Sequence, residues 1–377
     1  MKIAIDISQI AYPGTGVANY TVNLVKNVLG KDHENEYILF GISLRQLDIL
    51  DNYYNEVKRI NDRVTRKFLP MPQTLGNFLW NKLHKIHIER FLGKIDIFHS
   101  SDWIQPPTFA RKITTVHDMI VYRFPATSQS EIIDTQKKRL EWVRKECDVI
   151  LTDSLASKKD IVDILRLIPE KISVVYPGIG EDFRRVNDEE ILRIKQKYGL
   201  PDQYLLSVGT REPRKNLKRV IQSFDIFSRH PLVKAQRAPV ILVLVGKSGW
   251  EEFEIKGDKV KILGFIPNND LPALYSGANM FIYPSLYEGF GIPVIEAMAC
   301  GCPVISSRRG SLKEIVNDSG LVVDPIDTDD IALKMVQLFI DSDLRADLIE
   351  KGFKNAALFS WVSAADRIIN IYNKIYA

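Results

Sequence analysis

The chain has few cysteines, no long apolar run and little net charge. Only three of its 377 residues are cysteines, Cys147, Cys300 and Cys302, which provides no disulfide framework and suits a reducing compartment. The formal net charge of +4 is too small to indicate a nucleic-acid-binding protein, which needs a strongly basic face. No apolar run approaches the ~20 residues of a transmembrane helix, and the N-terminal MKIAIDIS lacks the regions of a signal peptide. We therefore expect a cytoplasmic protein that binds no nucleic acid and is held, at most, on the inner face of the plasma membrane.

Motifs for metal ions and for P-loop nucleotide binding are missing as well. Cys300 and Cys302 have no second ligand pair, so a zinc site of the usual spacing is not expected. His84 and His87 have no evident third ligand. The segment VGKSG at 245–249 lacks the upstream glycine of a P-loop. The sequence thus predicts no metal ion and no cofactor.

What the sequence does contain is a regular alternation of short apolar runs with longer helical patterns. Strands of a parallel sheet are covered by helices on both faces, so they are apolar along their whole length. The alternation therefore predicts an α/β protein with doubly wound parallel sheets. Strands are expected at 2–7, 36–42, 95–101, 112–118, 148–154 and 171–178 in the first half, and at 204–209, 239–246, 260–265, 279–285, 303–307 and 320–324 in the second.

The pattern breaks once, in PGIGEDFRRVNDEE at 177–190, where glycine and charged residues replace the strands. We place the domain junction there. The expected domains are 1–183 and 184–360, both Rossmann-like and facing each other across a cleft. A last helix at 361–377 either closes the second domain or packs back on the first. Ligands of such sheets bind beyond the carboxyl ends of the strands.

The strongest candidate site is the segment YPSLYEGFGIPVIEAMACGCPVISS at 283–307. It has the order strand, glycine-rich loop, helix, glycine stop, strand. Pro293 suits the first helical turn and Gly301 the C-terminal cap. Gly289 and Gly291 let the backbone approach a ligand, and the helix that follows offers free N–H groups and the positive end of its dipole. This arrangement can hold a phosphate or a sugar.

Two carboxylates flank this loop, Glu288 before it and Glu296 one turn inside the helix. Carboxylates accept hydrogen bonds from pairs of sugar hydroxyls. An isolated pair at this spacing is more often two solvated side chains. The loop and helix between them favour a shared ligand.

Here the chain resembles a known family. The spacing from Glu288 to Glu296 is similar to the E-x7-E signature of the retaining GT-B glycosyltransferases of family 4. Further segments match that family in the right order along nearly the whole chain, and the form GTREPRKN resembles its mannosyltransferase-like branch. These segments are GTGVANY (14–20), TTVHDMIVYRFP (114–125), VVYPGI (174–179), SVGTREPRKNLKRVI (207–221) and LGFIPNNDLPALYSGANMFIYPS (263–285).

The resemblance implies a GT-B fold, with acceptor binding by the first domain and binding of a nucleotide-sugar donor by the second. It assigns Glu296 to the ribose hydroxyls of the donor and Glu288 to the transferred sugar. Lys215 would hold the diphosphate. Many family members have an arginine directly after the glycine of this strand, where this chain has Thr210. The second cation is therefore either Arg211 or Arg214, and the choice stays open.

Other residues follow from the same resemblance. His117 comes after an apolar strand, so it should lie at a carboxyl end of the first sheet, where the family places a sugar contact. A lone histidine is about as often structural. Asp118 would cap the next helix or orient the loop. The resemblance places the catalytic role on Glu288, His117 and Lys215, the remaining donor contacts on Phe265, Ile266, Gly289, Phe290, Gly291 and Ile292, and the acceptor-side loop on Gly14, Gly16 and Asp118.

One stretch of the first half is strongly basic. Residues 58–94 hold nine lysines and arginines against Asp62 and Glu89, a net charge of +7. Within it, 75–93 is expected to form an amphipathic helix with aromatic and basic residues. Such a helix can lie on anionic lipid, which would suit a polyprenyl-diphosphate-linked acceptor. An ordinary helix packed on the sheet with a solvated basic face is an equal alternative.

Together these features predict a hexosyltransferase that uses a nucleoside-diphosphate sugar and acts on a hydroxyl of a glycan or lipid-linked saccharide in surface-polysaccharide or O-antigen synthesis. GDP-mannose is the first choice of donor on resemblance alone. Related activities remain open, namely a rhamnosyl- or glucosyltransferase, a glycogen-type synthase or a sugar-nucleotide epimerase. A catalytically silent sugar-nucleotide or nucleic-acid binding module is the non-enzymatic alternative, and the intact set of Glu288, Glu296 and Lys215 argues against it.

Overall fold

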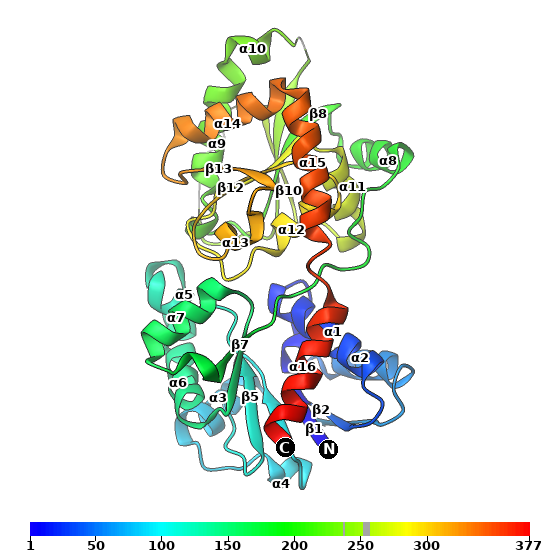
Figure 1. The fold of residues 1–377 in the computed structure, drawn as a ribbon, viewed down its shortest axis with the longest axis vertical. Coiled ribbons are helices and arrows are strands. Elements are labelled where there is room, and N and C mark those ends of the chain that lie inside the picture. The colour runs from blue at the N-terminus through cyan, green and yellow to red at the C-terminus, as the bar shows by residue number, and fades with distance from the viewer. Residues whose placement is uncertain (237, 252–256) are drawn as a thin grey trace. The chain divides into compact units, whose positions relative to one another are not determined.

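The computed structural model describes residues 1–236, 238–251 and 257–377. The chain forms two compact units, one made of 1–178 with 360–377 and the other of 179–359. The sequence-based boundary at 183/184 lies a few residues inside the second unit. Each unit holds one parallel sheet flanked by helices (Figure 1), so the predicted class of two doubly wound α/β domains is confirmed.

The first unit contains a seven-stranded sheet in the order β3-β2-β1-β4-β5-β6-β7, with all neighbours parallel. Successive residues of β1 point to opposite faces: Ile3 and Ile5 enter one core and Ala4 the other. Its strands are β1 Lys2–Asp6, β2 Glu36–Ile42, β3 Val64–Leu69, β4 Ile97–Ser100, β5 Arg111–Thr115, β6 Val149–Thr152 and β7 Ile172–Val174. Its helices are α1 Gly16–Lys31, α2 Leu47–Lys58, α3 Gln73–Asn77, α4 Glu89–Leu92, α5 Ile120–Arg123, α6 Ser130–Glu146, α7 Leu155–Leu165 and α16 Trp361–Tyr376.

The second unit contains a six-stranded sheet in the order β10-β9-β8-β11-β12-β13, again with parallel neighbours. Leu205 enters the core under α9 and α14, whereas Leu206 enters the core under α11 and α12. Its strands are β8 Gln203–Val208, β9 Val240–Val245, β10 Val260–Gly264, β11 Met280–Tyr283, β12 Val304–Ser307 and β13 Gly320–Val323. Its helices are α8 Asp188–Tyr198, α9 Leu217–Arg229, α10 Pro231–Lys234, α11 Leu271–Gly277, α12 Ile292–Ala299, α13 Leu312–Val316, α14 Thr328–Ile340 and α15 Ser342–Ala356.

The C-terminal helix α16 belongs to the first unit, where it lies against α1 (Figure 1). Ile368 and Tyr372 are fully buried in the core beneath it, and Lys31 of α1 pairs with Asp366 at 2.7 Å. Gly178 allows the chain to enter this packing, because a Cβ there would lie 2.1 Å from the backbone nitrogen of Trp361. The last helix therefore completes the core of the first unit.

All twelve expected strands are present, but the sequence analysis missed β3. This strand is an edge strand, and its middle residues are exposed. Arg66 and Lys67 at its centre hide it from a search for apolar runs. Charged side chains are common on edge strands because they prevent pairing with a further chain.

The expectation of one amphipathic helix over 75–93 is wrong. The segment forms α3, a short π-helix at Phe78–Leu83 and α4. It breaks at His84, whose φ of 49° is left-handed and cannot continue a helix. Trp80 is fully buried, whereas Leu75 and Phe78 remain exposed.

Within the described ranges, no helix combines the length and the apolar character needed to cross a bilayer.

Candidate active site

The second unit has its topological switch point between β8 and β11, where the chain order of the strands reverses. The loops that leave the carboxyl ends of such neighbouring strands diverge and leave room for a ligand. The loop after β8 carries Arg214 and Lys215, and the loop after β11 carries Glu288. Residues predicted from separate motifs thus come together at one edge of the sheet.

The loop between β11 and α12 is held by its backbone. Gly291 precedes the first residue of α12 with a left-handed φ of 109°, a conformation that glycine adopts without strain. Gly310 lies so close that a Cβ there would be 2.4 Å from the Glu288 carbonyl oxygen. Ser311 donates its hydroxyl to the carbonyls of Glu288 at 3.0 Å and Phe290 at 2.6 Å. The loop is therefore preformed, with Pro293 in the first turn of α12 and the helix N–H groups open to a ligand.

Glu288 lies between two cations. Its Oε2 accepts a hydrogen bond from Arg214 at 2.6 Å, and its Oε1 accepts one from Lys215 at 2.8 Å. Burial would raise the pKa of Glu288, but the charges of Arg214 and Lys215 outweigh it and lower the pKa to about 2. The carboxylate is therefore ionised at every physiological pH.

The two cations are held from several sides. Lys215 also donates to the Tyr283 hydroxyl at 2.6 Å, and Arg214 contacts the Tyr287 carbonyl at 2.7 Å as well as the Glu212 carboxylate. Burial and the charge of Arg214 lower the pKa of Lys215, which Glu288 partly restores. The predicted diphosphate cations are thus neutralised by acidic side chains in this structure.

Asn216, which was not predicted from the sequence as a site residue, ties the loop after β8 to the loops after β11 and β13. It has a left-handed φ of 62°, which asparagine tolerates better than most residues. Its side-chain amide donates to the carbonyls of Pro284 at 3.0 Å and Pro325 at 2.6 Å. Directly following Arg214 and Lys215, it fixes the position of both cations.

Glu296 lies one turn inside α12, as predicted, in a different environment from Glu288. It is half-buried, and the Tyr275 hydroxyl donates to it at 3.2 Å. Burial raises the pKa of Glu296 to about 7, against the smaller lowering effect of Tyr275. Within the part of the chain that the structure describes, no lysine or arginine pairs with this carboxyl as Arg214 and Lys215 pair with Glu288, so a ligand with paired hydroxyls would satisfy it.

The remaining donor-side residues divide into those at the loop and those farther along the edge. Arg211 contacts the Ser248 hydroxyl, so Arg214, and not Arg211, joins Lys215 at Glu288. Ile266 is buried, whereas Phe265 is 56% exposed, with the Lys247 ammonium 5.5 Å from its ring centroid. The predicted loop residues are Gly289, Phe290, Gly291 and Ile292. The Phe290 side chain is buried in the core, so this residue can offer a ligand only its backbone groups.

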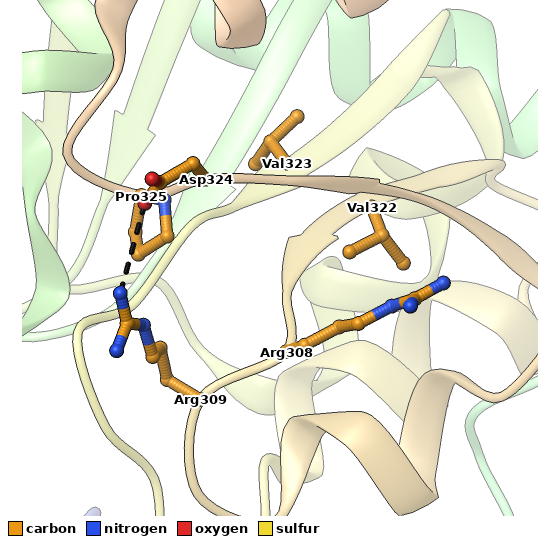
Figure 2. A pocket seen from close by; sticks show the side chains of 6 residues that line it. All are labelled: Arg308, Arg309, Val322, Val323, Asp324 and Pro325. Carbon is orange, nitrogen blue, oxygen red and sulfur yellow. Dashed lines mark ion pairs between the residues drawn. The ribbon is translucent and has the colours of Figure 1, made fainter.

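A cavity of about 520 Å³ opens at the same edge, beyond the carboxyl ends of β12 and β13. Figure 2 shows its two arginines pointing in different directions, with Arg309 directed to Asp324 at 3.8 Å. Arg308 and Arg309 immediately precede Gly310 and Ser311, which hold the Glu288 loop. The sequence analysis missed this pair because it belongs to none of the recognised motifs.

In the first unit, the predicted residues lie at the carboxyl edge of the sheet. His117 follows β5, and its Nδ1 lies 2.7 Å from a carboxylate oxygen of Asp153, which follows β6. Asp118 accepts from the Ile120 backbone N–H at 2.9 Å at the start of α5. Gly14 and Gly16 flank Thr15, the residue whose side chain caps α1. The sequence analysis missed Asp153.

Among the described residues, the structure contains no group of three or more histidine, cysteine, aspartate or glutamate side chains placed to hold a metal ion. His84 pairs with Glu146 at 2.5 Å, and His87 stacks on Phe109.

Comparison with known proteins gives a consistent result in sequence and in structure. The profile of Glycosyltransferase Family 4 matches residues 14–183, and that of Glycosyl transferases group 1 matches residues 188–355. The chain is 31% identical to an O-antigen chain mannosyltransferase B of Escherichia coli over 99% of both chains. It is 30% identical to the O-antigen chain mannosyltransferase RfbU of Salmonella typhimurium over 59% of each chain.

Solved structures with the same fold cover nearly the whole chain. The HepE protein of Anabaena, in complex with UDP and glucose, superposes with a TM-score of 0.72 at 18% identity over 99% of this chain and 100% of that one. WaaG, a glycosyltransferase involved in lipopolysaccharide biosynthesis, superposes with a TM-score of 0.68 at 15% identity over 98% and 99%. These likenesses confirm the predicted GT-B fold.

Proposed function

The chain belongs to glycosyltransferase family 4, and on that premise we propose that it transfers a mannosyl group from GDP-mannose to a hydroxyl of a glycan or lipid-linked saccharide, with retention of anomeric configuration. The family makes the chain a glycosyltransferase. The choice of mannose is supported by the two mannosyltransferase relatives. The same relatives support a place in O-antigen or surface-polysaccharide synthesis.

The observation that carries the proposal is the cluster of Glu288, Arg214 and Lys215 at the switch point of the second unit. A nucleoside diphosphate leaves with negative charge, and fixed cations and helix N–H groups lower the energy of that charge as it develops. We propose that Lys215 and Arg214 bind the diphosphate and that the backbone at Phe290–Ile292 binds the sugar-phosphate.

Two carboxylates complete the proposed donor site. Glu296 would accept the ribose hydroxyls, because it is half-buried and has one hydroxyl partner, Tyr275, in the structure. Glu288 would orient the transferred sugar. Phe265 and Ile266, after β10, would lie beside the nucleobase. We propose that no metal ion or cofactor takes part, because Arg214 and Lys215 supply the positive charge at the proposed diphosphate position.

For the reaction we propose a front-face displacement. The bond between the anomeric carbon and the diphosphate oxygen breaks while the acceptor oxygen bonds to the same face of that carbon. The acceptor proton passes to the departing phosphate oxygen. The protein contributes by positioning and by electrostatic stabilisation of the separating charges.

The acceptor side remains a separate proposal. Leu75, Phe78 and Leu83 are exposed apolar side chains within the basic stretch 58–94, and we propose that they rest on anionic lipid that carries a polyprenyl-diphosphate-linked acceptor. Phe78→Ser should reduce sedimentation with phosphatidylglycerol vesicles, while Phe353→Ser, on α15, serves as the matched control. If wild type and both variants sediment with the vesicles to the same extent, the proposed lipid contact is wrong.

Product analysis tests the activity itself. With GDP-mannose and a lipid-linked saccharide, mass spectrometry should find an acceptor one hexose heavier, and NMR should find the anomeric configuration of the donor retained. Parallel thermal-shift measurements with GDP, UDP, dTDP and their sugars should show the largest stabilisation for the guanosine donor. Conversion of the donor in the absence of acceptor, without glycosylated product, would instead indicate an epimerase or a hydrolase. If only UDP- or dTDP-sugars stabilise the protein, the proposed donor sugar is glucose or rhamnose and not mannose.

A further inference from the structure

The His117 side chain is held at one ring nitrogen and is partly exposed. Nδ1 lies 2.7 Å from Asp153 Oδ2, and the ring edge packs against Tyr20 at a centroid distance of 4.6 Å and an interplanar angle of 84°. Ser157 donates to the His117 backbone carbonyl at 3.0 Å. The side chain is nevertheless 18% exposed. Because Nδ1 is engaged, Nε2 is the nitrogen that can meet a ligand.

The Asp153 carboxylate is buried and depends on His117 as its charged partner. Its side chain is 8% exposed, and its second oxygen, Oδ1, is buried without a hydrogen-bond partner among the described residues. A buried carboxylate whose other oxygen is unsatisfied depends strongly on its one charged partner. The pair therefore favours a charged imidazolium over a neutral imidazole.

The other charges around the ring act in the same direction. Asp102, after β4, and Asp118, on the same loop as His117, add to the effect of Asp153. Burial by itself would lower the pKa of His117, but the charge and hydrogen bond of Asp153, with these two carboxylates, raise it to about 9. Tyr20, on α1, is also held neutral, since burial and Asp153 raise its pKa well above the usual value.

A more deeply buried histidine of the same unit provides the contrast. His99, on β4, is 4% exposed and has hydroxyl partners, Tyr372 at 2.7 Å and Thr115 at 3.3 Å. Burial, together with the charge of His117, lowers the pKa of His99 to about 4. The pKa values of these two imidazoles are thus shifted in opposite directions, because the Asp153 carboxylate outweighs burial at His117, whereas burial dominates at His99.

We propose that Asp153 is a positioning residue for the transfer reaction: it holds the His117 ring by Nδ1 in the doubly protonated form, so that Nε2 donates a hydrogen bond to an oxygen of a saccharide bound at the first unit and does not take the proton of the acceptor hydroxyl. The proposal rests on the proposed function and deepens it. It assigns His117 a binding role and leaves proton removal to the departing phosphate.

The first test is an NMR titration of the histidine side chains in the full chain, which needs no substrate. His117 should titrate near 9 and His99 near 4. In Asp153→Asn, His117 should titrate at or below the usual 6.5, because burial then acts with less opposition. Asp102→Asn removes the same charge without a hydrogen bond to the ring, so it should lower the titration point by less. A wild-type His117 that titrates near 6.5, or equal shifts in the two variants, would overturn the proposal.

The second test is the pH dependence of turnover, expressed as the ratio of Asp153→Asn to wild type. With His117 needed in its protonated form, this ratio should fall roughly twentyfold between pH 6 and pH 8, since a group with a pKa near 6.5 loses most of its protons over that range. A ratio that is constant with pH would show a purely structural role for Asp153, and a ratio that rises would show His117 acting as a base. If wild-type turnover is absent with every donor, the proposed function fails while the NMR result still decides the state of His117. Circular dichroism melts confirm that each variant is folded.

Discussion

At the scale of single residues, the two glutamates of the E-x7-E pair differ more than their spacing suggests. Glu288 is held between Arg214 and Lys215 and has a pKa of about 2, whereas Glu296 accepts a hydrogen bond from Tyr275 and has a pKa of about 7. The sequence predicted the position of both residues, because loop and helix signals are local. It could not predict their charge states, which depend on Tyr275 and on the cations from another loop.

Glu296 should make donor binding depend on pH. In the proposed donor site the ionised carboxylate accepts the ribose hydroxyls, and the free protein must lose a proton from a group with a pKa of about 7 to provide it. A raised carboxyl pKa means that the binding form is lost as pH falls, so affinity for GDP-mannose should increase about tenfold from pH 6 to pH 8. Calorimetry on wild type and Glu296→Gln checks this, since the variant should lack the dependence. The same slope in the variant would assign it to another group.

Glu288 should matter for both turnover and stability. Glu288→Gln removes the negative charge that neutralises two buried cations, Arg214 and Lys215. Turnover should therefore fall about 100-fold, and the free energy of unfolding should fall by about 3 kcal/mol. Because the folded-state pKa is lowered to about 2, the stabilising effect is present above the usual pKa of 4.5 and is lost as pH falls between these values. Urea melts at pH 7 and pH 3 measure the difference. Glu350→Gln, on the surface of α15, is the control, and equal effects in both variants would contradict the assignment.

At the scale of secondary structure elements, strands were predictable where burial on both faces makes them apolar, as in β8 and β9. They were not predictable at β3, because the exposed edge position tolerates the charged side chains of Arg66 and Lys67, which interrupt the apolar pattern. The helix expected over 75–93 failed for a different reason. Trp80 is buried with its indole N–H bonded to the Ile86 carbonyl at 3.0 Å, a tertiary contact that a helical pattern cannot reveal.

Asn216 should be the residue on which the loop after β8 depends most. Asn216→Ala removes two buried hydrogen bonds and leaves a residue with a Cβ at a left-handed φ. The free energy of unfolding should therefore fall by about 2–4 kcal/mol. Asn216→Gly loses the same hydrogen bonds yet tolerates the backbone, and should be the less destabilised of the two. Chemical denaturation of both variants measures this order. If alanine is tolerated as well as glycine, the left-handed conformation does not contribute.

At the scale of the whole molecule, the chain returns to its first unit after completing the second. The sequence left two positions open for the last helix, because an amphipathic pattern shows which face is buried but not against what. The structure places α16 on α1, where Ile368 and Tyr372 fill the core of the first unit. Residues at the C-terminus therefore stabilise strands at the N-terminus.

Ile368→Ala should destabilise the first unit alone, by about 2–5 kcal/mol. Hydrogen exchange measured by mass spectrometry should show faster exchange in β1 and β4 and unchanged exchange in β8 and β11. Ile340→Ala, at the exposed end of α14, is the control and should change neither set. Faster exchange in both sheets would mean that the two units unfold as one.

The most direct test of the proposed donor site is a calorimetric titration of GDP-mannose into wild type, Lys215→Ala and Lys354→Ala. Lys354 lies in α15 and pairs with Glu350 on the surface, so its variant controls for the loss of one positive charge. The cation cluster at the switch point predicts that wild type and Lys354→Ala bind alike and that Lys215→Ala binds at least tenfold more weakly. Equal affinity of all three proteins would show that the donor does not bind at the edge formed by β8 and β11.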